Sequence, residues 1–234
     1  HSMGVAIHLH CFTQGRAPQP ELEKYCHSVQ YYPRKKNISR FSFRIPFIVS
    51  SRVSSELADN LRKDDHPVLL EGIHCSWYLY NDMLPGRKVI VRLHNGEFEY
   101  YRQMARHEKN RLKRWYFLHE SRLLKKYERR LAAKARFIAV SAQDEKLYRD
   151  NFGSVQISYL PVFIPWTIAA GKEGRGCFCL YHGNLSVNEN EEAAIWLIEE
   201  VFSKADIPFV IAGKAPSPKK KKKVNRHNHT CLVS

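Results

Sequence analysis

Short apolar segments alternate with longer segments of helical periodicity along most of this 234-residue chain. The runs HPVLLEG (66–72) and KVIVRLHN (88–95) have the apolar character of strands that are buried on both faces. Strands of this kind that alternate with helices favour a parallel sheet covered by helices on both sides. The sequence therefore predicts an α/β fold, and its 44% of hydrophobic residues is enough for a packed core.

The same pattern gives the bounds of the expected elements. Strands are expected at 5–12, 28–33, 66–72, 88–95, 135–141, 155–161, 177–181, 208–212 and 230–233. Helices are expected at 18–26, 50–63, 97–134 with a break near Asn110 or His119, from Ser141 to Gly153, and at 189–204. Asp144 completes a capping box with Ser141. Residues 34–50 follow no regular pattern and are expected to be irregular.

A change in composition at 161–176 indicates a domain boundary. The segment PVFIPWTIAAGKEGRG holds two prolines and three glycines, as interdomain connections commonly do. We therefore predict two domains, at 4–162 and 163–234. The second has one strand–helix–strand unit and one further strand, too little for a complete doubly wound domain.

The net charge of +15 is concentrated in one segment. Residues 102–136 carry thirteen Arg or Lys against three Glu, and Lys219–Lys223 form a second run. Such an imbalance points to an anionic partner. Basic residues flank an aromatic band here, which suits an anionic membrane surface: Arg111, Lys113, Arg114, Trp115 and Phe117. The alternative is a core helix with a solvated basic face, and nucleic acid is the least favoured partner because no nucleic-acid-binding fold is visible.

Neither the cysteines nor the histidines form a metal pattern. The six cysteines include no C-x-x-C pair and are expected to be free thiols in a reducing cytoplasm. His8 and His10 point to one face of a strand, but no third ligand is evident, so both are expected to bond within the sheet. No apolar run approaches the ~20 residues that span a bilayer.

Five segments resemble a known family: VIVRLHNGEFEYY (89–101), YERRLAAKARFIAVSAQDEKLYRDNFG (127–153), LPVFIPW (160–166), LYHGNLSVNENEEAAIWLIEEVF (180–202) and FVIAGKAPS (209–217). Together they resemble GT-B glycosyltransferases of the family 4 type, especially the bacterial members that act on surface polysaccharides. The resemblance implies two Rossmann-like domains. The nucleotide-sugar donor would bind the C-terminal one and a saccharide or lipid-linked acceptor the N-terminal one. It also implies no metal or other cofactor, and a cytoplasmic protein peripheral to the inner membrane face.

The chain departs from that family at both ends. The family opens with a strand and a Gly-rich loop, whereas this chain begins at what resembles the second strand. The family also carries two glutamates, seven residues apart, at a point beyond Ser234. We therefore expect the chain to be truncated at both ends and to lack turnover by itself.

Two residues near strand ends are the catalytic candidates. The resemblance places a histidine such as His94 against the transferred sugar, where it would bond a hydroxyl or stabilise the departing phosphate. The alternative is a histidine bonded to its own loop. Glu71 would bond an acceptor hydroxyl, cap a helix or pair with an arginine. Asn95 and Ser141 follow strands as well and are expected to contact the acceptor or the sugar.

The donor candidates lie in the second domain. Gly183 allows a tight turn after a strand, and Asn184 and Ser186 follow it before a helix whose N–H groups suit a diphosphate. The cations that relatives place in this loop are absent, and the helix opens with acidic residues instead. Lys214, after the next strand, is the candidate cation, although a solvent-facing lysine fits as well. The competing hypothesis is a basic α/β module that binds a polyanion without catalysis.

Overall fold

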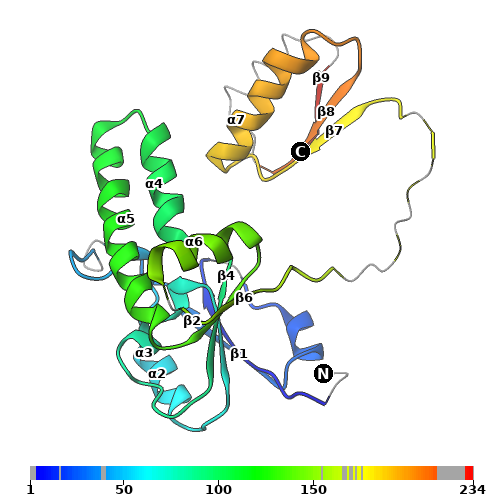
Figure 1. The fold of residues 1–234 in the computed structure, drawn as a ribbon. Coiled ribbons are helices and arrows are strands. Elements are labelled where there is room, and N and C mark those ends of the chain that lie inside the picture. The colour runs from blue at the N-terminus through cyan, green and yellow to red at the C-terminus, as the bar shows by residue number, and fades with distance from the viewer. Residues whose placement is uncertain are drawn as a thin grey trace. The chain divides into compact units, whose positions relative to one another are not determined.

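The computed structural model describes residues 4–15, 17–37, 41–153, 155–164, 168, 171, 173–174, 176–214 and 230–233. The chain divides into two compact units, His1–Ile164 and Pro165–Ser234 (Figure 1). Every strand pairing in the described residues is parallel. The predicted α/β class with parallel sheets is therefore confirmed.

Unit 1 contains two sheets and the longest helices. Its strands are β1 (His8–Thr13), β2 (Ser28–Pro33), β3 (Val68–Glu71), β4 (Val89–Leu93), β5 (Arg136–Ala139) and β6 (Ile157–Tyr159). β1 pairs with β2, and the other four form a sheet in the order β3-β4-β5-β6. The helical elements are η1 (Pro20–Lys24), α1 (Phe47–Ser50), α2 (Ser55–Leu61), η3 (Ile73–Cys75), α3 (Trp77–Tyr80), α4 (Glu97–His107), α5 (Arg111–Ala132) and α6 (Ala142–Phe152).

Side-chain caps explain several helix boundaries. Ser141 accepts a hydrogen bond from the amide of Asp144 at 3.1 Å and donates to its carboxylate at 2.5 Å, so the predicted cap of α6 is confirmed. That helix ends at Gly153, whose φ of 68° suits glycine. Asn110 accepts from the amides of Leu112 and Lys113 at the start of α5. The break near Asn110 is therefore confirmed, and helix α5 runs through His119 without one.

Residues 34–50 are not irregular throughout, because α1 forms at Phe47–Ser50. The amide of Phe47 donates to the Glu120 carboxylate at 2.7 Å, across 73 positions of sequence. A cap that comes from so far along the chain leaves no local sequence signal. α3 was also missed, since its four residues are too few for a periodic pattern.

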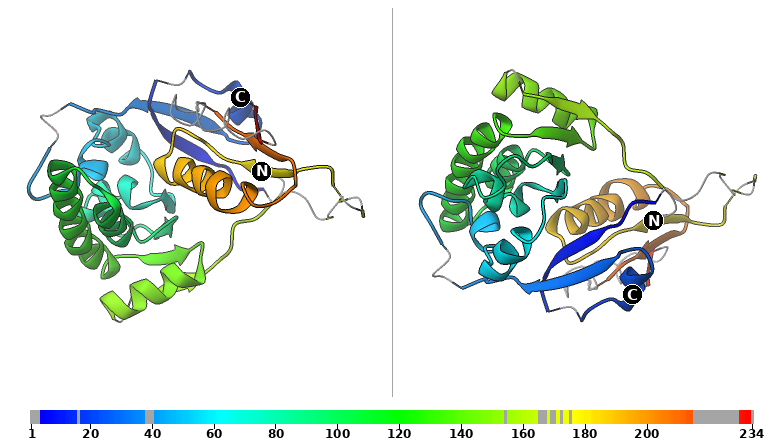
Figure 2. Two further views of the ribbon diagram at one scale, coloured as in Figure 1. Left: turned by 90° about the horizontal axis from the view of Figure 1, so that it is seen from above. Right: turned by 90° about the horizontal axis from the view of Figure 1, so that it is seen from below.

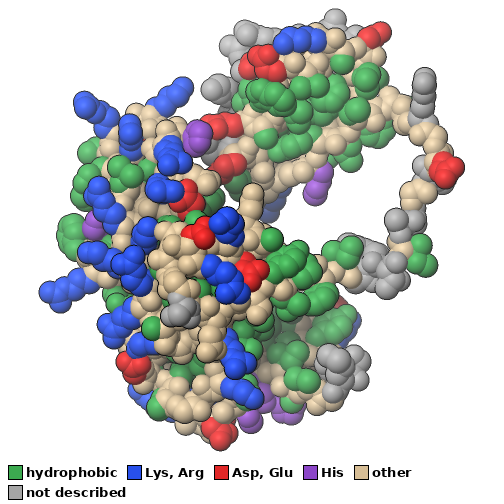
Figure 3. All heavy atoms as spheres, viewed as in Figure 1, with side chains coloured by type: hydrophobic (Ala, Val, Ile, Leu, Met, Phe, Trp, Pro, Cys, Tyr) green, Lys and Arg blue, Asp and Glu red, His purple; other side chains and the backbone are tan. Residues whose placement is uncertain are grey.

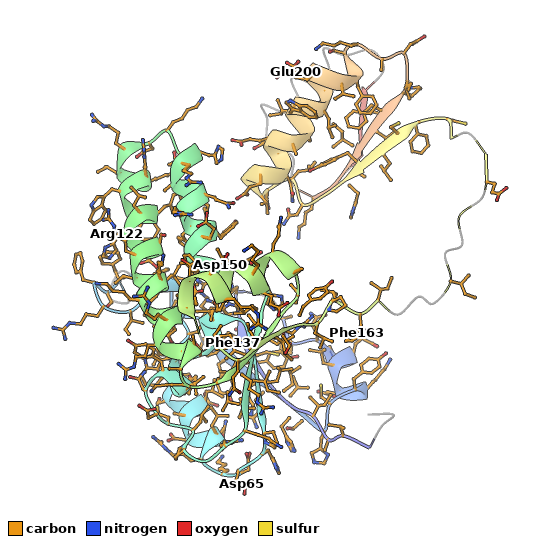
Figure 4. The ribbon with its side chains drawn as sticks, in the orientation of Figure 1. Asp65, Arg122, Phe137, Asp150, Phe163 and Glu200 are labelled. Atoms are coloured by element: carbon orange, nitrogen blue, oxygen red, sulfur yellow. The ribbon has the colours of Figure 1, made fainter. Side chains whose placement is uncertain are left out.

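Helices α4 and α5 lie side by side and cover one side of unit 1 (Figures 1 and 2). The core beneath them is formed by apolar and aromatic side chains from strands and helices, among them Val91, Leu93, Leu124, Tyr127, Phe137 and Tyr148. Phe137 lies among these packed side chains, whereas Arg122 lies on the outer helix (Figure 4).

In its described residues, unit 2 has a three-stranded sheet and one helix. Its elements are β7 (Cys179–His182), α7 (Asn188–Trp196), the π-helical continuation η4 (Leu197–Phe202), β8 (Phe209–Ala212) and β9 (Thr230–Val233). The strand order is β7-β8-β9. The core consists of Leu185, Ala194, Ile198, Phe209 and Ile211.

Candidate functional site

The carboxyl ends of β3 and β4 bring together a charged cluster. Glu71 and Arg92 are register partners in the parallel pair, and Arg92 Nη1 donates to both oxygens of Glu71 at 3.1 and 3.2 Å. His94 Nε2 lies 3.1 Å from Glu71 Oε2. The side chains of His94 and Glu71 are each 46% exposed, so both reach solvent at the edge where parallel sheets bind ligands. The structure thus joins the two catalytic candidates directly.

Arg92 was missed in the sequence, although it left a signal. It is the one charged residue in the apolar run VIVRL, and β3 supplies the carboxylate that it needs. His94 bonds to Glu71 of the neighbouring strand, whereas the alternative stated for His94 was a bond to its own loop. Glu71 does pair with an arginine, as one of its structural alternatives stated.

His74 lies beside this cluster and left no sequence signal. Its ring covers Gly72, where a Cβ atom would lie 2.5 Å from the imidazole Cε1. Gly72 adopts φ 95°, a conformation that favours glycine. Burial, together with the charges of Arg52, His94 and Arg34, lowers the pKa of His74 to about 4. His74 is therefore neutral at pH 7 and close to three basic side chains.

The loop that carries His94 is fixed by two carboxylates from other helices. Gly96 N donates to Asp144 Oδ1 at 2.8 Å, and Phe98 N donates to Glu128 Oε1 at 3.0 Å. Glu128 also accepts from the Tyr148 hydroxyl. Burial raises the pKa of Glu128 to about 8. The first turn of α4 is thus satisfied from within the protein.

The other two candidates near this edge differ in availability. Asn95 is exposed in the loop after β4. The Ser141 hydroxyl is used by the α6 cap, since it both donates to and accepts from Asp144. Of these two, Asn95 is the side chain that is open to a ligand.

In unit 2, the loop after β7 is closed against the end of β8. Gly183 N donates to Ala212 O, and Leu185 N donates to Lys214 O, each at 3.1 Å. A Cβ atom on Gly213 would lie 1.9 Å from Gly183 O, whereas one on Gly183 would make only ordinary contacts. Gly183 was predicted to allow a tight turn, but the position at which the close backbone approach excludes a side chain is Gly213.

The polar side chains of this loop bond to one another. Asn184 Oδ1 accepts from the Ser186 amide at 3.2 Å and from its hydroxyl at 2.8 Å. Asn190 Nδ2 donates to Asn184 O at 3.0 Å. Lys214 is exposed, and its backbone pairing with Leu185 holds it beside the loop. The four donor candidates thus lie together, with Lys214 as the cation among them.

The basic segment occupies α4 and α5, over which Lys and Arg side chains gather (Figure 3). Arg111, Lys113 and Arg114 are exposed, and Trp115 is 54% exposed and stacks on His119. Phe117 differs from the expectation for it. It is half-buried with its ring against Tyr101 of α4, at 6.1 Å between centroids, so it contributes to helix packing.

Exposed apolar side chains extend the aromatic surface beyond Trp115. Leu112 is 81% exposed and Phe43 is 69% exposed, and the Phe43 ring lies 5.3 Å from that of His119. Phe43 falls in the segment read as irregular and was not predicted here. None of the described helices is both long and apolar enough to cross a membrane.

His8 and His10 each bond within unit 1, His8 Nδ1 to Ser28 Oγ at 2.9 Å and His10 Nδ1 to Tyr32 Oη at 2.8 Å. Across the described ranges, no three His, Cys, Asp or Glu side chains are grouped as a metal site would require.

Known proteins resemble this chain in sequence and in fold. No protein-family model matches it. The "Uncharacterized 44.6 kDa protein in cps region" of Klebsiella pneumoniae is 27% identical over 210 residues, which are 85% of this chain and 53% of the relative. The crystal structure of Arabidopsis thaliana UGT89C1 complexed with UDP-L-rhamnose matches with a TM-score of 0.54 at 14% identity, over 99% of this chain and 63% of that one.

The structural match confirms the predicted GT-B fold, since that neighbour is a GT-B glycosyltransferase. The sequence relative lies in a capsule gene region. The chain spans about half the length of this relative. Membership of family 4 stays a prediction.

Proposed function

We propose that this chain belongs to a glycosyltransferase that moves a sugar from a nucleotide-sugar donor to a saccharide or lipid-linked acceptor during cell-surface polysaccharide synthesis. The observation that carries the proposal is the Glu71–Arg92–His94 cluster at the carboxyl edge of a parallel sheet. The glycosyltransferase fold and the relative from a capsule region support it.

His94 is the residue that we propose to contact the reacting groups. Its imidazole is exposed, and the bond to Glu71 orients the ring. An imidazole held this way exchanges hydrogen bonds with a sugar hydroxyl or, when protonated, stabilises a leaving phosphate. Glu71 in turn is held by Arg92, so it acts mainly by positioning His94.

The donor diphosphate is assigned to the loop after β7 and to Lys214. UGT89C1 was crystallised with UDP-L-rhamnose, a nucleotide sugar, which supports a donor of this class. Lys214 supplies the charge that the loop itself lacks. The first turn of α7 contains two acidic residues, Glu189 and Glu191, which interact favourably with the helix dipole. Their charges repel a phosphate placed directly at the N-terminus of the helix.

We further propose that the protein works at the inner face of a membrane. The exposed cations Arg111, Lys113 and Arg114 and the exposed Trp115 and Leu112 lie within one and a half turns of α5. Cations beside apolar side chains favour an anionic lipid surface over a soluble polyanion, because lipid offers both partners.

Thermal unfolding with a panel of nucleoside diphosphates, and separately with heparin and duplex DNA, tests the enzyme proposal. A ligand present at 100 times its Kd stabilises the folded chain by about 2.7 kcal/mol. We expect one or more nucleoside diphosphates to raise the melting temperature, and Lys214→Ala to reduce that rise. Stabilisation by heparin or DNA alone would support the polyanion-binding alternative.

A further inference from the structure

We propose that Arg34 and Arg52 form a site for a phosphate or diphosphate group on the acceptor, next to His94. The inference rests on the proposed function and specifies its acceptor: a phosphorylated one. Neither arginine was a candidate from the sequence.

One turn of the chain holds both guanidinium groups. Arg34 Nε donates to Ser51 Oγ at 3.0 Å, and Arg52 Nη1 donates to Ile48 O at 2.6 Å. Ser51 Oγ itself donates to Ile48 O at 3.3 Å. The two guanidinium groups are thus linked by a short chain of hydrogen bonds, and each uses one of its five N–H groups in it.

The charge of this pair is not balanced by ion pairing. Within the part of the chain that the structure describes, neither guanidinium has a carboxylate oxygen within 4.0 Å. Burial lowers the pKa of both arginines, and the charge of Arg34 lowers that of Arg52 further, yet arginine stays protonated at pH 7. Two half-buried like charges this close are unfavourable until an anion binds between them.

Glu97 is the carboxyl group whose charge acts on Arg52, and it is a weak counter-ion. Burial raises the pKa of Glu97 to about 7, with Arg52 opposing the shift and Asp144 adding to it. This carboxyl is therefore partly protonated near pH 7. The pair keeps a net positive charge.

The pair and His94 both lie just after strands of unit 1, in its two separate sheets. Arg34 directly follows the carboxyl end of β2, as His94 follows that of β4. His74 connects the two positions, because the charges of Arg52, His94 and Arg34 all act on its imidazole. An anion at the arginines therefore sits close to the residue proposed to meet the transferred sugar.

A phosphate fits this site better than a carboxylate. Two arginine forks present several N–H donors, and a phosphate or diphosphate has the oxygens to accept from both at once. A phosphate on the acceptor would anchor it while its hydroxyl reaches His94.

Isothermal titration calorimetry of the chain with inorganic pyrophosphate tests the site. We expect Arg34→Gln and Arg52→Gln each to weaken binding about tenfold or more, as loss of a charge-assisted pair does. The matched control is Lys36→Gln, which removes one exposed charge from the same segment and should change the affinity less than twofold. A second control, Arg111→Gln with Lys113→Gln, should leave binding unchanged.

Arg34→Lys and Arg52→Lys keep the test valid if a glutamine variant unfolds. They retain the charge but lose the fork, and we expect an intermediate affinity. Unchanged affinity in the arginine variants, or an equal loss with Lys36→Gln, would overturn the inference.

Two further ligands separate the sources of the phosphate. Binding of farnesyl diphosphate that exceeds that of pyrophosphate, and depends on both arginines, would identify a lipid-borne diphosphate. Arginine-dependent binding of glucose 1-phosphate in preference would identify a soluble sugar phosphate. Stabilisation by nucleoside diphosphates should be the same in the wild type and in all these variants. Its absence from the wild type would contradict the proposed function, whereas unchanged pyrophosphate affinity in the arginine variants would contradict this site.

Discussion

A carboxylate that accepts from two side chains holds an exposed imidazole in one orientation, and Glu71 does this for His94. Orientation matters because a catalytic contact acts only when it meets the transition state in the right geometry. The bond therefore suits a residue that must wait for a substrate in a solvent-exposed position.

In the enzyme to which we propose that this chain belongs, His94→Ala should lower kcat/KM for sugar transfer at least tenfold, because a contact made in the transition state is lost. The melting temperature should stay within a few degrees of wild type, since His94 is exposed. The assay is release of nucleoside diphosphate, with His107→Ala at the exposed end of α4 as the control. A variant that unfolds readily but keeps its specific activity would make His94 a structural residue.

Gly213 and Gly183 allow a matched test of the donor loop. Gly213→Ala forces a methyl group against Gly183 O, and such overpacking typically costs about 1–3 kcal/mol. Gly183→Ala meets only ordinary contacts and should cost much less. Hydrogen exchange of the amides in β7 and β8 should accelerate in the first variant and stay near wild type in the second. Equal exchange in both would show that the loop is not fixed by this approach.

At the scale of the element, buried carboxyl groups make the helices of unit 1 sensitive to pH. Glu120 is fully buried, and burial raises its pKa to about 7. In this it resembles Glu128. A carboxyl with a raised folded-state pKa binds its proton more tightly when folded. The contribution of protonated Glu120 to the free energy of unfolding is therefore fully present below the unfolded-state pKa near 4.5. It is lost as the pH rises through 7.

The free energy of unfolding of unit 1 should therefore fall between pH 5 and pH 8. Glu120→Gln removes one titrating group and keeps an oxygen for the Phe47 amide, so it should flatten the slope. At pH 8 we expect the free energy of unfolding of this variant to exceed that of the wild type by about 1 kcal/mol or more, because a shift of one pKa unit corresponds to about 1.4 kcal/mol. Urea unfolding at several pH values measures this, with the exposed Glu56→Gln as control. An unchanged slope in Glu120→Gln would contradict the assignment.

Elements with local signals were predictable. The α6 cap at Ser141, the break at Asn110 and the apolar strands all follow from nearby residues. The arginine pair was not predictable, since Arg34 and Arg52 meet through a turn that a distant carboxylate caps. The same holds for Gly213, whose neighbour Gly183 comes from another strand end. Candidate residues could be identified from the sequence where they lie at the end of a strand, as His94 and Glu71 do. Residues that are brought together only by contacts between distant segments could not.

At the scale of the whole molecule, the basic surface should direct the chain to anionic lipid. We expect the chain to sediment with vesicles that contain anionic lipid at low salt, much less at high salt, and not with neutral vesicles. The reason is that screening shortens to ~3 Å at molar ionic strength. Exchange of Arg111, Lys113 and Arg114 for Glu should abolish sedimentation and preserve the fold.

The matched control reverses three exposed lysines on other parts of unit 1: Lys24, Lys63 and Lys146. It carries the same change in net charge and should still bind. Equal binding to neutral vesicles would indicate hydrophobic adhesion. An equal loss of vesicle binding in both variants would show that the binding depends on net charge alone and not on the surface of α5.

The bond between Phe47 and Glu120 has a consequence for how the protein is made. Translation proceeds from the amino terminus, so α1 leaves the ribosome 73 residues before the carboxylate that caps it. Until α5 emerges and packs, the turn that carries Ile48 and Ser51 has no cap, and Arg34 and Arg52 lack their common anchor. Contacts between distant segments form late because loop closure must precede them. In the nascent chain, helices α4 and α5 therefore form before the turn that joins Arg34 and Arg52 is capped.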